Sequence, residues 1–190
     1  MNEVLVNFFG SRALFPVLIF LSAALMLALT VYLLKVSPEN VEKMEKLSRW
    51  RVPGIVLGTF VVAWCIPHAM PILPESFHKL LFPVLVAVVI GSWFVLDHLF
   101  ARALGGYLIL TAHLFLRETF AYEAISNPVF PVLCFLYGTF GIFLCGVPYR
   151  LRDIVRLELK PGYRWIIPGF FAVMSLAFVT MGICYLRVAE

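Results

Sequence analysis

The sequence predicts an all-α integral membrane protein, a six-span helical bundle that forms one membrane domain over residues 1–190. Of the residues, 62% are hydrophobic and 14% are charged, whereas soluble domains contain roughly 45–50% apolar and about 25% charged residues. The charges are clustered, so the apolar stretches between them reach roughly 20 residues, the length that a helix needs to cross a bilayer. The word FPVL also opens three of these stretches.

The positions of the apolar stretches place the six spans. They cover about 14–34, 52–73, 77–96, 102–122, 128–147 and 165–186. The fourth span is the most polar. Five crossing spans, with the fourth dipping into the membrane and back, are therefore the alternative.

The distribution of Lys and Arg predicts the orientation in the membrane. If the N-terminus is outside, the inner connectors hold 11 of the 15 Lys and Arg residues. These are Lys35, Lys43, Lys46, Arg49, Arg51, Arg102, Arg150, Arg152, Arg156, Lys160 and Arg164. Because cytoplasmic loops carry the excess of basic residues, we expect a multi-pass protein of the cell membrane with both termini on the outer side.

The recurrence of FPVL suggests an internal repeat. Phe15 and Phe130 are as far apart along the chain as Pro53 and Pro168, each of which is followed by glycine. This common offset predicts three helical hairpins, at about 14–73, 77–122 and 128–187, of which the middle one has a tight inner turn. Convergence is the alternative, since Phe and Pro suit the first turn of any span.

Two inner connectors predict short amphipathic helices on the inner membrane surface, after spans one and five. Ser37 is the expected N-cap of the first helix, with Pro38 at its first position. In the second, Pro148 precedes an apolar face formed by Leu151 and Val155. The basic residues expected to contact anionic lipid are Lys43, Lys46, Arg150, Arg152 and Arg156. An ordinary solvated helical loop is the alternative.

The fourth span carries the candidate site. Helical spacing places Arg102, His113 and Arg117 on one face, and Thr111 and Glu118 on a neighbouring stripe. Ionisable groups inside a membrane are costly and usually functional, so these five residues are the candidate lining of a polar cavity. The interpretation favoured over the cavity is a packed central helix whose polar groups bond to its neighbours. Gly105 and Gly106 favour close packing in either case.

Other candidate residues lie near the ends of the spans. Asp97 and His98 are expected to form a charge network with Arg102 at the tight inner turn. His113 is expected to lie deeper in the membrane than His68, which argues against a haem held between them. The four cysteines form no CxxC pair, so no metal site is predicted and any cofactor is unknown.

The sequence contains no motif of a known catalytic centre and no soluble domain to carry one. We therefore predict no catalytic residues and favour a non-enzyme, namely an accessory or scaffold subunit of a membrane complex. Its expected partners are the lipid bilayer and other membrane subunits or further copies of itself, not nucleic acid. A small transporter or channel using the fourth span is the alternative, and a membrane enzyme acting on lipid or quinone is the third choice.

Overall fold

The computed structural model describes residues 14–122, 128–160 and 162–189, and every regular element within these ranges is a helix. Six of the helices are long and apolar enough to cross a membrane, which confirms the all-α fold and the number of candidate spans. They are α2 (Leu14–Leu34), α4 (Arg51–Ala69), α5 (Leu81–Val95), α6 (Leu99–Tyr122), α7 (Val129–Gly146) and α9 (Ile166–Ala189). The third reaches the necessary length only with the helical residues before α5, as the span Ser76–Val95.

Two helix boundaries differ from the predicted ones for identifiable reasons. The second span was expected to reach residue 73, but α4 ends at Ala69, because Pro71 and Pro74 cannot continue a helix. The third begins with a 3₁₀ helix, η2 (Glu75–Leu80), before α5. The fourth span is one continuous helix of 24 residues, which is long enough to cross without a break.

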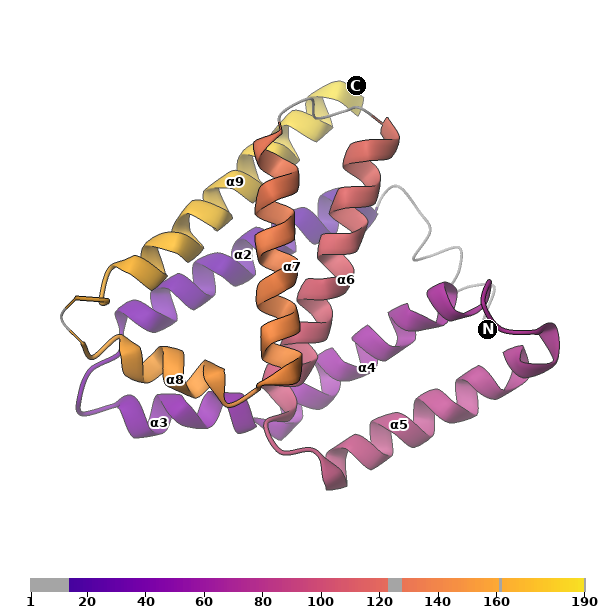
Figure 1. Ribbon diagram of the computed structural model, residues 1–190, viewed down its shortest axis with the longest axis horizontal. Coiled ribbons are helices and arrows are strands. Elements are labelled where there is room, and N and C mark those ends of the chain that lie inside the picture. The colour runs from indigo at the N-terminus through magenta and orange to yellow at the C-terminus, as the bar shows by residue number, and fades with distance from the viewer. Residues whose placement is uncertain (1–13, 123–127, 161, 190) are drawn as a thin grey trace.

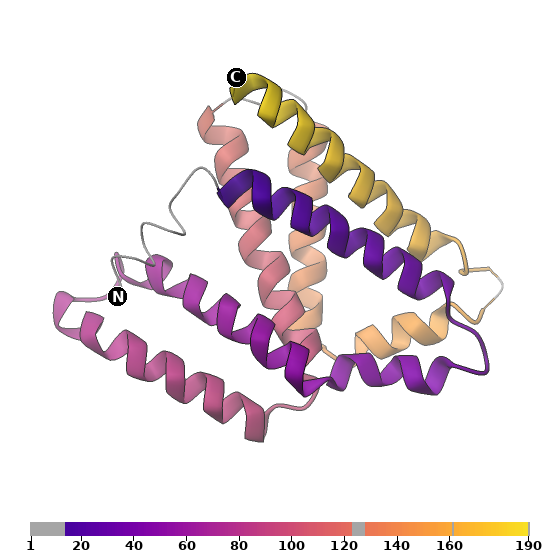
Figure 2. The same ribbon diagram turned by 180° about the vertical axis from the view of Figure 1, so that it is seen from behind.

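Helix α6 is the most buried of the six and forms the centre of the fold. It packs against α7 and α4, while α2 packs antiparallel to α9 and α5 packs on α4. Figure 1 and Figure 2 show α6 and α7 between α2 and α9 on one side and α4 and α5 on the other. The most extensive contacts join helices from different predicted hairpins, and the hairpin repeat stays a prediction.

The FPVL word opens three helices in the same register. Phe15, Phe82 and Phe130 are each the second residue of their helix, and a proline follows each as the third. Phe15 and Phe130 are 1% and 0% exposed, whereas Phe82 is 41% exposed. The first and third occurrences of FPVL therefore supply core residues, whereas the second does not.

An aromatic cluster joins four helices. The Phe115 ring of α6 lies 5.6 Å from that of Phe15 and 5.5 Å from that of Phe178, both in edge-to-face geometry. The Phe130 and Tyr137 rings of α7 are each 6.4 Å from the same ring. Such pairs add to the energy of burial because each ring edge meets a negatively charged face. This cluster holds α2, α6, α7 and α9 together.

The α6–α7 contact depends on two glycines. A Cβ atom added to Gly105 would lie 2.6 Å from the Gly141 carbonyl oxygen, and one added to Gly141 would lie 2.8 Å from that of Gly105. No larger residue allows the two backbones to approach so closely. The predicted role of Gly105 in close helix packing is thus confirmed.

Short helices occur in both connectors where they were expected. They are α3 (Val41–Glu45), which continues as the 3₁₀ helix η1 (Lys46–Arg49), and α8 (Arg150–Leu157). The predicted start of the first, with Ser37 as N-cap and Pro38 inside the helix, is wrong. Asn40 instead holds a turn: its side chain accepts a hydrogen bond from the Ser37 amide and donates one to the Lys35 carbonyl.

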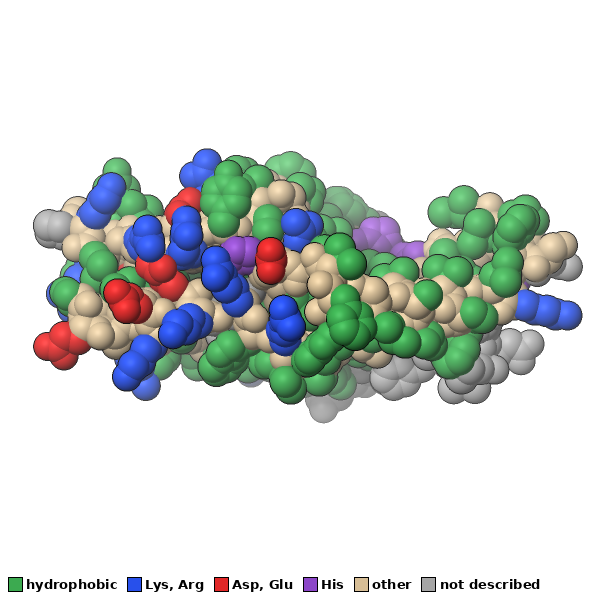
Figure 3. Space-filling view, turned by 90° about the horizontal axis from the view of Figure 1, so that it is seen from below, with side chains coloured by type: hydrophobic (Ala, Val, Ile, Leu, Met, Phe, Trp, Pro, Cys, Tyr) green, Lys and Arg blue, Asp and Glu red, His purple; other side chains and the backbone are tan. Residues whose placement is uncertain are grey.

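Helices α3 and α8 lie side by side along one edge of the bundle. The start of α2 and the end of α9 lie toward the opposite edge, so both ends of the described chain share a side. Figure 3 shows Lys and Arg side chains gathered over the part of the molecule where α3 and α8 lie. The location of this layer on the inner membrane surface stays a prediction.

Candidate functional site

The five polar residues that are candidates for lining one cavity point in two directions from α6. Thr111 and Glu118 are buried against the neighbouring helices, whereas Arg102, His113 and Arg117 are exposed. Of the five, Arg102 lines a cavity of about 250 Å³ between α4, α5 and α6. The structure therefore does not bring these residues together around a common space.

Thr111, on the core-facing side of α6, is hydrogen-bonded within the bundle. The Thr111 hydroxyl donates to the Tyr107 carbonyl oxygen at 2.7 Å and lies 3.4 Å from the Tyr137 hydroxyl. The Tyr107 hydroxyl is in turn 3.1 Å from the Ser22 hydroxyl of α2. These bonds offset the cost of burying polar groups, so this side of α6 serves packing with α7 and α2.

Glu118 is a buried carboxylate with an exposed partner. It is 4% exposed, and its Oε1 accepts a hydrogen bond from Arg117 Nη2 at 2.8 Å. Its Oε2 has no hydrogen-bond partner among the described residues. Because a buried carboxylate needs its charge compensated, the ion pair fixes Arg117 near the C-terminal end of α6.

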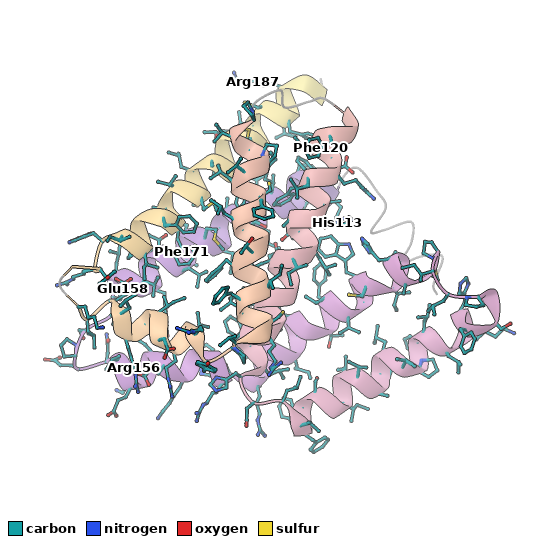
Figure 4. The ribbon with its side chains drawn as sticks, viewed as in Figure 1. His113, Phe120, Arg156, Glu158, Phe171 and Arg187 are labelled. Carbon is teal, nitrogen blue, oxygen red and sulfur yellow. The ribbon has the colours of Figure 1, made fainter. Side chains whose placement is uncertain are left out.

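Two histidines from α4 and α6 are in contact. The rings of His68 and His113 lie edge to face, with centroids 5.5 Å apart. His68 Nδ1 donates to the Trp64 carbonyl oxygen at 3.1 Å, which fixes the orientation of the ring. The two imidazoles are thus neighbours although their helices are far apart in the sequence, and their relative depth in the membrane stays a prediction. Figure 4 shows His113 on α6.

This histidine pair has no third ligand of the usual kind close by. Within the described residues no group of three or more His, Cys, Asp and Glu side chains is placed to hold a metal ion. Both imidazoles belong to the exposed surface of their helices. We call His68, His113 and Arg117 the outer polar face, after the side of the membrane on which they are predicted to lie.

The turn between α5 and α6, predicted to lie on the inner side, holds the Asp97–His98 pair together with cations from two other elements. Burial lowers the pKa of His98, and the guanidinium of Arg49 in η1 lowers it further. Arg152 of α8 and Arg102 act in the same direction, whereas Asp97 opposes them. The imidazole is therefore neutral at pH 7 in a positively charged setting.

A polar hollow of about 170 Å³ lies between η1 and α8. Its lining residues are Glu42, Glu45, Lys46, Arg49 and Arg152. Two of the predicted lipid-contacting residues, Lys46 and Arg152, thus face one space, which Arg49 also lines although it was not singled out from the sequence. Lys43 and Arg150 are exposed on the same layer, and their contact with anionic lipid stays a prediction.

No protein-family model, curated protein or solved structure matches this chain.

Sequence reasoning also missed Glu158, just beyond the end of α8 (Figure 4). The residue is 3% exposed, and neither carboxylate oxygen has a hydrogen-bond partner among the described residues. Burial raises its pKa, and Arg164 partly offsets the rise. A lone acid in a polar connector is ordinarily solvated, so nothing in the sequence distinguishes this one.

Proposed function

We propose that the protein is a non-catalytic accessory subunit that binds another membrane protein through the outer polar face. The observation that carries this proposal is the exposure of ionisable side chains on helices that would otherwise meet lipid at this position. Ionisable residues within membrane helices almost always face protein or a water-filled cavity, because hydrocarbon cannot solvate them. A partner helix satisfies this requirement.

The depth of His113 strengthens the argument. It precedes the end of α6 at Tyr122 by about 13 Å, at roughly 1.5 Å per residue. An imidazole cannot extend that far, so His113 is unable to reach the interface as a long Lys or Arg side chain does. The matching partner carries an acceptor oxygen, a carboxylate or a carbonyl, that faces His113 and Arg117.

Helix α5 offers a second reason to expect a neighbouring protein. It contributes no buried residue, and its main contact in the bundle is with α4. Phe94 and Val95 at its end are 77% and 80% exposed. Helices in membranes associate through close packing against other helices, and an apolar helix held on one side leaves its other side available.

Site-specific photo-cross-linking in native membranes tests the proposal. A cross-linker at position 113 is expected to capture one defined protein, whereas the same group at Val132, an exposed position of α7, captures lipid. His113→Leu should then weaken co-purification of that protein while leaving expression intact. Capture of the same products from both positions would contradict the proposal.

A transporter is the second candidate, because Arg102 of the polar helix lines the 250 Å³ cavity. Reconstitution in liposomes separates the two functions. A flux that is abolished by Arg102→Ala would favour transport, whereas an accessory subunit shows no flux that depends on this side chain.

A further inference from the structure

The 250 Å³ cavity is an apolar groove along α4, α5 and α6, with Cys145 of α7 also in its lining. Gly58 of α4, Val88 of α5 and Ala103 of α6 are among its lining residues. Its hydroxyl groups are already occupied: Thr59 and Ser92 each donate to a carbonyl oxygen of their own helix at 2.8 Å. A bound water needs two to four polar partners, so this lining favours a hydrocarbon occupant.

One cation lines the groove. Arg102 belongs to the first turn of α6, and its Nη1 donates to the Cys145 carbonyl oxygen at 3.3 Å. Among the described residues no carboxylate forms a salt bridge with its guanidinium. A guanidinium carries five N–H donors in a planar fork that matches phosphate oxygens, and most of these donors remain available.

Two further arginines lie near Arg102 at this end of the groove. Besides burial, the guanidinium groups of Arg49, Arg152 and Arg102 each lower the pKa of the His98 imidazole, whereas Asp97 raises it. Arg49 and Arg152 also line the polar hollow together with two glutamates of α3, so carboxylates share their charge. Arg102 is therefore the cation that a bound headgroup would meet, and basic pockets between membrane helices bind anionic headgroups.

We propose that the Arg102 groove binds an anionic phospholipid, with an acyl chain lying between α4, α5 and α6 and the phosphate held by Arg102. Pockets that enclose a whole small molecule usually measure about 300–1,000 Å³, so a cavity of about 250 Å³ accommodates part of a lipid chain. The site lies at the end of α6 opposite the outer polar face, so it does not depend on the proposed partner. It is a specific lipid site rather than a general attraction of the basic layer to the membrane.

Native mass spectrometry of the full chain in detergent tests headgroup recognition. Phosphatidylglycerol should remain bound better than phosphatidylcholine with the same acyl chains. Arg102→Gln should reduce phosphatidylglycerol binding about five-fold, as expected for one basic residue at the headgroup. Arg150→Gln, a change to an exposed arginine of α8, is the matched control and should leave binding unchanged.

Filling the groove tests the position of the acyl chain. Val88→Phe places a larger side chain in the groove from α5, which carries no core residue, and should reduce binding of both lipids. Val86→Phe on the same helix lies outside the lining and serves as control. Inorganic phosphate should not displace the lipid, because it lacks the chain.

Three outcomes would overturn the inference. They are equal retention of the two lipids by the natural chain, an equal loss with Arg102→Gln and Arg150→Gln, and unchanged binding with Val88→Phe. Thermal unfolding of each variant in the same detergent identifies any variant that has lost its fold. If Val88→Phe has lost its fold, Gly58→Leu is used in its place to fill the groove. A Cβ atom added at Gly58 lies 3.7 Å from the Ala103 Cβ, an ordinary van der Waals contact.

Discussion

Arg156 of α8 donates two parallel hydrogen bonds to the carboxylate of Glu45 in α3, and the bond from Nη2 to Oε2 is 2.9 Å long. The two residues are 111 positions apart. Bidentate arginine–carboxylate pairs fix direction as well as distance. This contact therefore joins two connectors into one layer beneath the helices.

The Glu45–Arg156 pair should make the stability of the connector layer depend on pH. The hydrogen bond from Arg156 lowers the pKa of Glu45, so the pair stabilises the fold above the ordinary titration range of glutamate. That contribution is lost as the pH falls through the lowered pKa. Thermal unfolding of the natural chain and Glu45→Gln should accordingly converge in acid. Glu39→Gln, which changes an exposed acid, should behave like the natural chain throughout.

Removal of the Glu158 charge should stabilise the protein at neutral pH. Burial raises the pKa of this carboxyl group, so the fold prefers the protonated form and loses stability as the pH rises through that pKa. Glu158→Gln should raise the free energy of unfolding at pH 7 by about 1 kcal/mol, because burying an unpaired polar group carries a penalty. It should also make unfolding less dependent on pH. Asp153→Asn on α8 is the control. A loss of stability at every pH would mean that the carboxylate is paired.

The glycine contact between α6 and α7 should tolerate no added methyl group. Gly105→Ala forces the helices apart and is expected to cost about 1–3 kcal/mol, the usual range for overpacking. Gly91→Ala on α5 is the matched control, because an added Cβ there meets nothing within 4 Å. It should be neutral or stabilising by about 0.5–1 kcal/mol. Chemical unfolding in detergent, followed by circular dichroism, measures both.

The predicted orientation can be tested with cysteine labelling. In a chain whose four natural cysteines are replaced by alanine, cysteines at Lys43 and Arg150 should react with an impermeant reagent from the inner side alone. A cysteine at Lys79, between α4 and α5, should react from the outer side. Labelling of all three positions from one side would contradict six crossings and the positive-inside assignment.

Much of the fold was predictable from local chemistry. The ends of α2 agree with the predicted first span because an uninterrupted apolar run has one natural extent. The end of α4 was misplaced because a helix tolerates Pro67 in its last turns and stops before Pro71. The common position of Phe and Pro at the start of three helices followed directly from the repeated FPVL sequence.

The candidate site was less predictable, since it depends on which helices meet. Periodicity separated the two polar stripes of α6, yet it did not reveal that one faces α7 while the other is exposed beside α4. Likewise, nothing in the positions of His68 and His113 along the chain indicates their contact. Their depths depend on how far each helix tilts, which packing determines.

Composition and charge by themselves determined the all-helical class, six apolar segments and the basic character of two connectors. Each of these follows from a local requirement on the sequence. In lipid, the backbone groups of a segment must be hydrogen-bonded within that segment, and charged side chains must stay near water. Only the tertiary structure decided that α2 pairs with α9, that Glu45 meets Arg156, and that Arg102 lines an apolar groove. Such contacts depend on side-chain shape across helices distant in sequence.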